Sequence, residues 1–439
     1  MKRLMAFILS SLLLPAAAYA QATVPEPVFP AHAVKLELNS GDTSWMLVST
    51  ALVLLMTIPG LALFYAGMVR KKNILGTLSQ VFAACALVSV LWFALGYSLA
   101  FSAGNGWLGG LDAALLQGVR FDKPQGLVSV HAAAPTVPEA VYLLFQLSFA
   151  VITPALIVGA VAERMRFAAL MWFIGGWSLV VYAPIAHWVW GPGGWLATLG
   201  ALDFAGGTVV HLNAGIAGLV AAWWLKPRLG HGQVAMQPSN LGYTLIGASL
   251  LWVGWIGFNG GSAGAANGQA AMALLATQLA AAAGTLAWML TEWSLRRRPT
   301  LLGMCSGALA GLVAVTPASG YVTPDAAVLI GVAAGLGCFW GATGLKAWLG
   351  VDDSLDVFGV HAVGGLIGAL LTGVLADEAM AGVRGSLAVQ AIACAATLAY
   401  SAVGTAGVLW LVGQLLALRI TPQQEVAGLD WSQHAERLE

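Results

Sequence analysis

Two histidines, His211 and His361, lie deep inside long apolar segments, and each begins the same short pattern, His-x-x-x-Gly-x-x-Gly. An ionisable group in such surroundings is costly, so its presence favours a functional role. A neutral imidazole offers one hydrogen-bond donor and one acceptor, and it takes up a proton near physiological pH. The pair therefore predicts a proton-handling pore.

The composition indicates what must position these two side chains. Of the 439 residues, 59% are hydrophobic and 9% are charged, whereas soluble domains have about 25% charged residues. We therefore expect an all-α integral membrane protein. The 54 glycines suit helices that pack closely in lipid, and the formal net charge of zero argues against a nucleic-acid partner.

Eleven apolar segments are long enough to cross a hydrocarbon core of about 30 Å as helices. They are 44–69, 76–101, 138–161, 167–187, 206–226, 240–261, 269–295, 301–316, 324–348, 356–376 and 388–418. We expect 44–418 to form one transmembrane transporter domain, and 419–439 to form a cytoplasmic tail.

The first twenty residues have the pattern of a removable signal peptide. Lys2 and Arg3 precede a short apolar run that ends at Ala18-Tyr19-Ala20, a small-x-small cleavage site. The mature chain is then expected to begin near Gln21, with 21–43 as an extracytoplasmic segment. An uncleaved anchor helix is the alternative interpretation.

Basic residues predict the orientation in the membrane. Those on alternate connections are Arg70, Lys71, Lys72, Arg164, Arg166, Lys226, Arg228, Arg296, Arg297, Arg298, Lys346 and Arg419, against Lys35, Arg120, Lys123 and Arg384 on the other side. By the positive-inside rule, the N-terminus is extracytoplasmic and the C-terminus is cytoplasmic.

The histidine pattern recurs in the fifth and tenth segments. Because five helices separate the copies, the second copy enters the membrane from the opposite face, which is typical of inverted repeats in transporters. We therefore expect spans 1–5 and 6–10 to form an inverted five-helix repeat, followed by a long eleventh helix. Glycines four and seven residues after each histidine, such as Gly215 and Gly365, lie on its face of the helix and allow close packing.

Several longer motifs resemble those of the ammonium transporter (Amt) family, of the bacterial type. The resemblance covers the chain from about Ser44 to the tail. The motifs are Asp203-Phe-Ala-Gly-Gly-Thr-Val-Val-His211, Asp352-Asp-Ser-Leu-Asp356-Val-Phe-Gly-Val-His361, Gly60-Leu-Ala-Leu-Phe-Tyr-Ala-Gly67, Phe145-Gln-Leu-Ser-Phe149, Ala162-Glu-Arg-Met-Arg-Phe167 and Gly257-Phe-Asn-Gly-Gly-Ser262-Ala-Gly264.

The resemblance implies a homotrimer in the bacterial inner membrane, with one pore per protomer, no enzymatic activity and no cofactor or metal. It also implies that the tail, with Gly428-Leu-Asp430 and His434, cooperates with a cytoplasmic PII-type signalling protein. It assigns Trp190, Phe145, Ser262, Asp203 and Thr316 to an outer recruitment site, and Phe149, Phe258, Trp255, His211 and His361 to the gate and pore.

The chemistry of ammonium is compatible with these assignments. An aromatic face such as that of Trp190 stabilises a cation by about 0.5–2 kcal/mol, whereas burying the bare cation in an apolar pore costs several kcal/mol. We therefore expect the proton to leave near the gate and neutral ammonia to pass the histidines. Potassium has no proton to lose, so such a pore rejects it. Whether the proton also crosses is left open, with a net ammonium equivalent favoured.

Helix geometry gives a test of the histidine pair. Asp203 lies eight residues before His211, and Asp356 lies five before His361, so the rings lie roughly 12 and 8 Å beyond their acids. Contact between the rings then requires recessed helix starts. We expect a buried Asp203 that accepts N–H groups at its helix start, with direct proton acceptance as the alternative.

Other polar residues are given structural interpretations. Asp352, Asp353 and Asp356 are expected to cap a helix, Glu163 and Glu292 to pair with arginines, and His187 to be an ordinary residue of the interface. The cysteines at 85, 305, 338 and 394 are expected to pack inside spans without disulfides.

Three other functions compete with transport. They are a membrane ammonium sensor, for which a fused signalling domain is expected; an intramembrane metal hydrolase using His211, His361 and Asp203; and an Rh-type channel for a neutral gas or urea. The hydrolase lacks an evident nucleophile or His-Glu-x-x-His motif. Trp190, Phe145 and Phe149 fit the Amt outer site better than an Rh-type channel.

Overall fold

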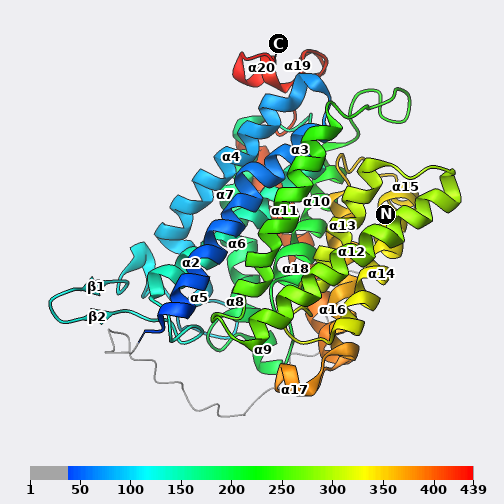
Figure 1. Cartoon of the computed structure of the whole chain (residues 1–439). Helices are drawn as coiled ribbons and strands as arrows, with labels where there is room; N and C mark the ends of the chain where they lie inside the picture. Colours follow the sequence, from blue (N-terminus) through cyan, green and yellow to red (C-terminus); the bar gives the residue numbers. More distant parts are fainter. Residues whose placement is uncertain (1–37, 439) are drawn as a thin grey trace, which may run out of the picture.

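A computed structural model describes residues 38–438, which form a bundle of long helices (Figure 1). The expected signal peptide and most of the segment 21–43 lie outside the described residues. We call the end of the bundle that carries α19 (Pro422–Ala427) and α20 (Leu429–His434) the tail face. The opposite end carries β1 (Phe121–Asp122) and β2 (Leu127–Val128) and is called the hairpin face.

Ten described helices are long and apolar enough to cross a membrane, and the shorter apolar helix Leu301–Val315 completes eleven crossings. The predicted all-α membrane fold is therefore confirmed. The predicted spans agree with the observed helices to within a few residues in most cases. The first helix begins earlier than expected, at Ser40, and the fourth span continues to Trp190 before a short helix ends it at Leu199.

The first five crossings form one repeat. Symbols beginning with η denote π-helical or 3₁₀ turns. The elements are α2 (Ser40–Leu55), η1 (Met56–Leu61), α3 (Ala62–Met68), η2 (Lys71–Asn73), α4 (Ile74–Leu91), η3 (Trp92–Gly96), α5 (Tyr97–Phe101), η4 (Ala114–Leu116), α6 (Glu139–Val161), α7 (Phe167–Trp177), η5 (Ser178–Tyr182), α8 (Ala183–Trp190), α9 (Trp195–Leu199), η6 (Gly207–Leu212) and α10 (Asn213–Leu225).

The next five crossings form the second repeat, and the eleventh follows it. The elements are α11 (Leu241–Gly261), α12 (Gly268–Arg296), α13 (Leu301–Val315), α14 (Pro324–Trp340), η7 (Gly341–Leu345), α15 (Lys346–Leu349), η8 (Phe358–Ala362), α16 (Val363–Leu375), α17 (Glu378–Ala381) and α18 (Leu387–Leu415).

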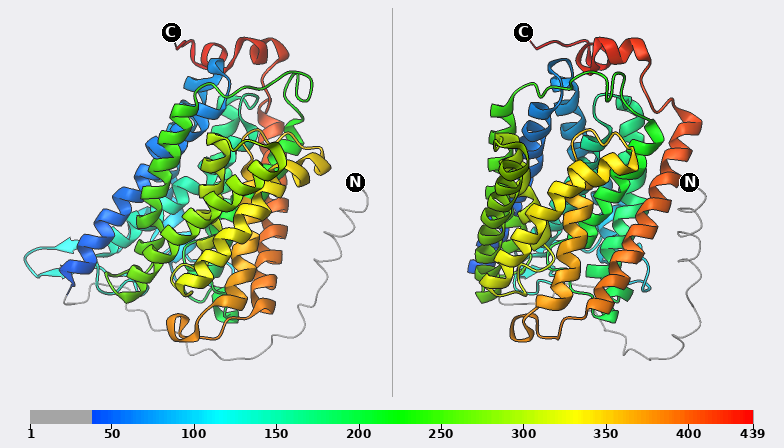
Figure 2. Two further views of the ribbon diagram at one scale, coloured as in Figure 1. Left: turned by 45° about the vertical axis from the view of Figure 1, so that its right-hand side comes forward. Right: turned by 90° about the vertical axis from the view of Figure 1, so that its right-hand side faces the viewer.

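The two repeats run in opposite directions. At the start of α11, the Asn240 N–H donates to the carbonyl of Gly67 at the end of α3, at 3.0 Å. The neighbouring Ser239 N–H donates to the Val69 carbonyl at 2.9 Å. The sixth crossing therefore begins at the face where the first one ends, as an inverted repeat requires. The later crossing α18 runs along the edge of the bundle (Figure 2).

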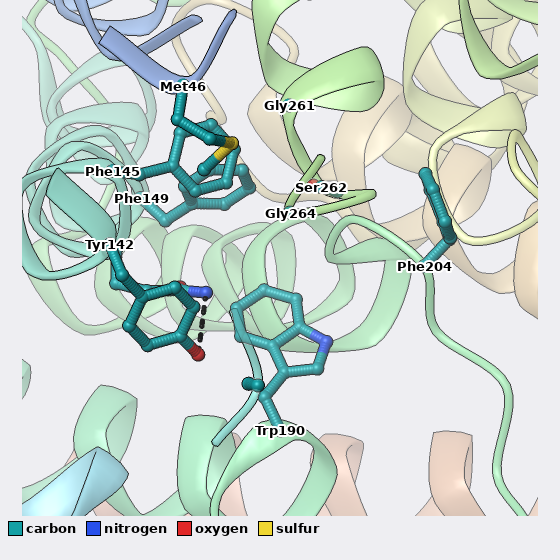
Figure 3. A pocket seen from close by; sticks show the side chains of 11 residues that line it. Met46, Tyr142, Phe145, Phe149, Trp190, Phe204, Gly261, Ser262 and Gly264 are labelled. Carbon is teal, nitrogen blue, oxygen red and sulfur yellow. Dashed lines mark hydrogen bonds between the residues drawn. The ribbon is translucent and has the colours of Figure 1, made fainter. Parts of the chain in front are cut away.

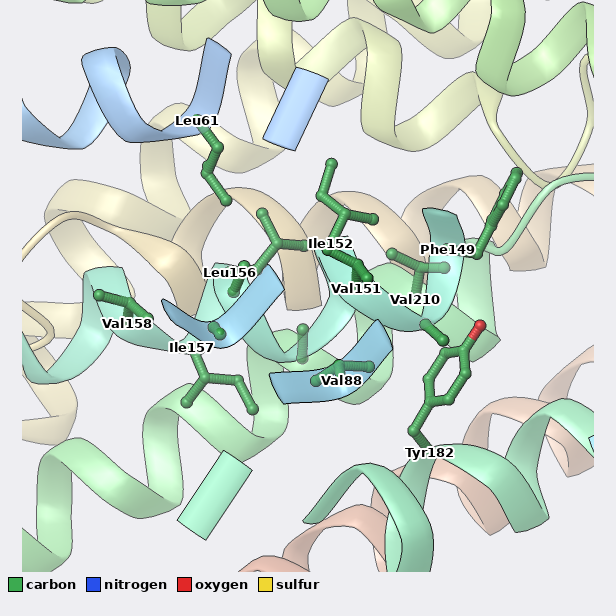
Figure 4. Close-up of a cluster of buried hydrophobic side chains, with 14 of the residues drawn as sticks. Leu61, Val88, Phe149, Val151, Ile152, Leu156, Ile157, Val158, Tyr182 and Val210 are labelled. Carbon is green, nitrogen blue, oxygen red and sulfur yellow. The ribbon is translucent and has the colours of Figure 1, made fainter. Parts of the chain in front are cut away.

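Helix α6 lies in the centre of the core. Every residue from Leu147 to Val161 is buried, as expected for a helix that is apolar on all sides. Ile152 and Leu156 of α6 lie in the same buried cluster as Leu61 and Val88 (Figure 4). This core fixes one wall along which the candidate site is built.

Candidate functional site

The two histidine rings meet in the middle of the fold. His361 Nδ1 lies 3.2 Å from His211 Nδ1, and the ring centroids are 5.3 Å apart with the planes inclined by 22°. Two nitrogens at this distance can share only one proton. One ring therefore carries its proton at Nδ1 and the other accepts there, which leaves one Nε2 as an acceptor and the other as a donor.

Each histidine lies in a π-helical turn, His211 in η6 and His361 in η8. Turns of this kind are rare and occur frequently at functional sites. Glycines allow the two turns to approach each other. A Cβ atom on Gly365 would lie 2.6 Å from the carbonyl oxygen of Gly207, and one on Gly215 would lie 2.6 Å from Ala362 Cβ. The first glycine of each motif, Gly215 or Gly365, thus faces the opposite histidine's helix.

Asp203 holds the start of the helix that carries His211. The residue is 6% exposed, and its carboxylate accepts the backbone N–H groups of Gly206, Gly207, Thr208 and Val209 at 2.6–3.2 Å. The Thr208 hydroxyl donates to it as well, at 2.5 Å. Both carboxylate oxygens are therefore engaged, which favours the structural role over direct proton acceptance. Burial raises the pKa of Asp203, and these hydrogen bonds offset part of that rise.

The corresponding acid in the second repeat is Asp353, which lies eight residues before His361 just as Asp203 lies eight before His211. Asp353 Oδ2 accepts the Phe358 N–H at the start of η8, at 2.8 Å. The expectation that used Asp356 for this position is wrong, because the Asp356 carboxylate pairs with Lys346 instead. Sequence spacing identifies Asp353 once the two histidines are aligned.

A cavity of about 140 Å³ opens on the hairpin-face side of this centre. Trp190, Phe145 and Ser262 line it, as do Phe149 and Phe204 (Figure 3). The Trp190 indole N–H donates to the Asp203 carbonyl at 2.8 Å, which fixes the ring of Trp190 beside the cavity. The Ser262 hydroxyl donates to the Phe258 carbonyl at 2.8 Å, so its lone pairs remain as acceptors.

Aromatic rings connect the cavity with the histidines. Phe149 and Phe258 stack with their centroids 4.1 Å apart, and the Phe258 centroid lies 6.0 Å from that of His211. Trp255 contacts both rings, with its centroid 5.3 Å from that of His211 and 5.4 Å from that of Phe258. The order along the molecule is therefore cavity, phenylalanine pair, His211 and His361.

The structure does not bring every expected recruitment residue to the cavity. Neither Asp203 nor Thr316 is among the residues that line it. The Thr316 hydroxyl accepts the Trp255 indole N–H at 2.9 Å and donates to the Leu312 carbonyl at 2.8 Å, so it orients Trp255. Trp190 lies beyond the predicted span 167–187 but is still helical, as the last residue of α8.

Sequence reasoning missed two polar residues of the cavity, Tyr142 and Gln146. The Gln146 amide N–H donates to the Tyr142 hydroxyl at 3.3 Å, and within residues 38–438 the Gln146 carbonyl oxygen is buried without a hydrogen-bond partner. Their positions, three residues before Phe145 and three before Phe149, place them within one turn of the two expected rings. Helical periodicity around Phe145 and Phe149 was the available signal.

The tail face carries a buried ion-pair network that joins connections of both repeats. Glu163 pairs with Arg70 at 2.6 Å and with Arg228 at 3.4 Å, and Arg228 pairs with Asp352 at 2.8 Å. Burial alone would raise the pKa values of Glu163 and Asp352, but the neighbouring guanidinium groups hold both pKa values below their ordinary range. Asp352 is thus an ion-pair partner and not a helix cap.

The expected pairing of Glu292 is also present, with Arg296 at 3.2 Å. The four cysteines are buried and free. His187 is buried, with its two ring nitrogens 2.9 and 2.7 Å from the carbonyls of Ala100 and Asn105. Within the described part of the chain, no cluster of three His, Cys, Asp or Glu side chains is arranged to hold a metal ion.

The chain is similar to known proteins over most of its length. The family model described as Ammonium Transporter Family matches residues 44–438. The "Ammonium transporter" of Bacillus subtilis is 46% identical over 409 residues, which cover 91% of this chain and 98% of that protein. The crystal structure of Saccharomyces cerevisiae Mep2 superposes with a TM-score of 0.79 at 38% identity, covering 88% of this chain and 91% of that one.

A structure described as "Sensor Amt Protein" is also similar, with a TM-score of 0.82 at 27% identity and coverage of 90% of this chain and 98% of that one. The family model spans nearly the whole sequence, and the relatives match over nearly their whole lengths. The chain belongs to the ammonium transporter family.

Proposed function

We propose that this protein, an ammonium transporter by family, recruits ammonium in the hairpin-face cavity and passes neutral ammonia along His211 and His361. The observation that carries the proposal is the unbroken order of cavity, stacked Phe149 and Phe258, and paired imidazoles. All of these groups are buried or lie in the cavity wall. The order supports a route from the hairpin face to the centre of the fold.

The cavity suits a small cation that can donate hydrogen bonds. The Trp190 ring presents a π-face, and the Ser262 hydroxyl presents an acceptor. A cation–π contact contributes about 0.5–2 kcal/mol, which replaces part of the hydration that ammonium loses on entering. Phe145 completes the aromatic wall of the cavity.

The stacked Phe149 and Phe258 then separate the cation from the histidines. Taking an unpaired charge past two buried rings costs several kcal/mol, whereas ammonia carries no net charge. The proton therefore leaves on the cavity side of the rings. Its final destination determines whether the process moves charge, and we propose a net ammonium equivalent in which proton and ammonia travel separately.

The paired imidazoles offer ammonia a donor and an acceptor. Within the described residues, His211 Nε2 is buried and has no hydrogen-bond partner. Such a nitrogen is costly to leave unpaired, so it is a binding position for a small polar molecule. Ammonia can both donate and accept, and it suits either tautomer of the pair.

The proposal extends to assembly and orientation. The hairpin face is outside and the tail face is cytoplasmic in the bacterial inner membrane, since the basic connections meet at the tail face. Three protomers assemble, each with its own route, and a PII-type protein binds the tail face. A sensing role is the second candidate, favoured by the similarity to the structure described as a sensor Amt protein.

The test is uptake of methylammonium, an ammonium analogue, by proteoliposomes with the membrane voltage recorded. The variants His211→Ala and His361→Ala each remove one polar contact worth about 1 kcal/mol, so we expect the rate to fall about fivefold or the rejection of K⁺ to weaken. His434→Ala, in the tail, is the matched control. Parent-like rate and selectivity in both variants would contradict the proposal, and absence of flux in the parent would favour the sensor.

A further inference from the structure

A third histidine, His131, lies beside the hairpin-face cavity, in the connection between α5 and α6. Ala133, two residues later in the same turn, lines the cavity, and so does Tyr142 of α6. The His131 ring contacts both of these lining residues. It can therefore act on the cavity without touching an ion inside it.

The hydrogen bonds of the His131 ring suit only the neutral form. Nδ1 accepts the Ala133 N–H at 3.1 Å, and Nε2 lies 3.1 Å from the Phe101 carbonyl at the end of α5. A carbonyl can only accept, so Nε2 carries the proton and Nδ1 keeps its lone pair. The Ala134 N–H closes the turn on the His131 carbonyl at 3.0 Å. A second proton, on Nδ1, would face the Ala133 N–H and break that bond.

The same ring supports a polar side chain of the cavity wall. His131 stacks on Tyr142, with the centroids 4.5 Å apart and the planes inclined by 10°. The Tyr142 hydroxyl in turn accepts the Gln146 amide N–H (Figure 3). Gln146 lines the cavity, and its carbonyl oxygen has no hydrogen-bond partner in the part of the chain that the structure describes. Through Tyr142, the His131 ring thus orients this amide.

The surroundings of His131 determine when it takes up a proton. Helix α5 places Tyr97 and Phe101 against the ring, with centroids 6.4 and 5.9 Å away. Helix α6 contributes Tyr142 and the carboxylate of Glu139, which accepts the Tyr97 hydroxyl at 2.8 Å. Burial lowers the pKa of His131, and the Phe101 carbonyl and Glu139 offset part of this effect. The ring is therefore neutral at neutral pH and is protonated only in acid, below its ordinary value of about 6.5.

We propose that His131 is a positioning residue of the hairpin-face cavity, and that its protonation by an acid exterior weakens the recruitment of ammonium. The inference rests on the proposed function, because it takes this cavity as the recruitment site. Protonation releases Ala133 from its anchor. It also places a positive charge one aromatic ring away from a site that must attract a cation. Both effects act on recruitment, and neither acts on the histidine pair at the centre.

The test is methylammonium uptake by intact cells that produce the full chain and have no other ammonium transporter, because the hairpin face of every copy then meets the external buffer. KM and the maximal rate are measured as the external pH falls from about 7 to about 4.5, where an alkylammonium stays protonated. In the parent, KM should rise about fivefold in acid, since the added charge lies one ring from the cavity and the partly aqueous medium weakens the repulsion. KM does not depend on how much protein folds, so low expression cannot imitate this result.

Two variants isolate the titration of His131. His131→Asn cannot take up a proton in this range, and its side-chain oxygen can still accept the Ala133 N–H, as in an Asx turn. Its KM should stay constant across the range. His231→Asn is the matched control, because it removes an exposed histidine from the tail face. It should keep the pH profile of the parent.

Trp190→Ala separates this inference from the function on which it rests. If Trp190→Ala raises KM at neutral pH, the cavity recruits the ion. A parent KM that is constant with pH, or a His131→Asn variant that keeps the parent's dependence on pH, would then overturn the role of His131 alone. If Trp190→Ala leaves KM unchanged, the cavity does not recruit the ion, and both proposals fail.

Discussion

The two oxygens of the buried Asp203 carboxylate accept five hydrogen bonds. Four of them come from backbone N–H groups at the start of η6, which would otherwise lack a partner because the first N–H groups of a helix have no intrahelical acceptor. The position of His211 depends on this arrangement. Asp203 therefore acts on the proposed route through geometry.

Replacing Asp203 with asparagine tests that role. The amide has one acceptor oxygen and presents N–H groups to donors, so buried donors lose their partner, and we expect stability to fall by about 3–5 kcal/mol. The midpoint of thermal unfolding in detergent measures this loss. Asp112→Asn, on an exposed loop, is the control and should change the midpoint little. An unchanged midpoint for Asp203→Asn would show that the cap is dispensable.

The pKa of Asp353 predicts how the stability of the fold depends on pH. Burial raises its pKa to about 6, above the value of about 3.9 for a free aspartate. Because the pKa is higher in the folded state, the protonated carboxyl stabilises the fold. This contribution is fully present below about pH 4 and is lost as the pH rises through about 6.

The Asp353→Asn variant lacks this titration. The difference in stability between variant and parent should thus change by up to about 3 kcal/mol between pH 4 and pH 7, in favour of the variant at the higher pH. Thermal unfolding at both pH values measures it, with Asp112→Asn again as the control. A constant difference across this range would mean that Asp353 does not titrate there.

The residue types of the centre could be predicted from the sequence, but their contacts could not. The His-x-x-x-Gly-x-x-Gly repeats indicate two helices that cross closely, and the helix-rise argument requires a buried Asp203. Thr316 shows the limit, because a hydroxyl can serve as a ligand or as a support, and only the position of the Trp255 indole decides between them. Tyr142 and Gln146 line the cavity as well, and their spacing from Phe145 and Phe149 could have indicated it.

At the scale of elements, the close approach of the two histidine helices depends on glycines, which have no side chain. Gly215→Ala places a methyl group against Ala362, and the packed interior has no room for it. We expect this overpacking to cost about 1–3 kcal/mol, measured by thermal unfolding. Gly407→Ala, in open space on α18, should have little effect. If the two variants unfold alike, the glycine motif does not set the helix separation.

The spans themselves were predictable because hydropathy and length suffice to locate a membrane helix. The π-helical turns at His211 and His361 were not, because every residue of these turns is buried and the sequence there has no polar face whose shift would reveal a wide turn. Asp353 was not recognised as the counterpart of Asp203, although each lies eight residues before its histidine. That equivalence follows from the two helix starts, where each acid accepts N–H groups of its own helix.

At the scale of the molecule, hydrogen bonds hold the tail against the first repeat and against the connection between the two repeats. Lys72 Nζ donates to the carbonyls of Glu425 and Val426 at 2.9 and 2.6 Å, and Asp430 accepts the Gly76 N–H at 2.8 Å. The Glu425 carboxylate, buried at 2% exposure, accepts the Leu229 N–H at 2.7 Å. The tail helices thus join α4, the connection after α10 and the end of α18.

Replacing Glu425 should loosen the attachment of the tail helices to the rest of the bundle. Glu425→Gln removes the charge that pairs with Arg419, and breaking a buried pair leaves the partner uncompensated. We expect faster amide hydrogen exchange in α19, α20 and residues 226–240, with the core helices unchanged, because local opening costs less than global unfolding. Glu436→Gln, exposed beyond α20, serves as the control. Exchange that rises equally in α6 would mean that the whole fold has weakened, and exchange that does not rise at all would mean that the tail is held by its apolar contacts, chiefly Leu429 packed against α4.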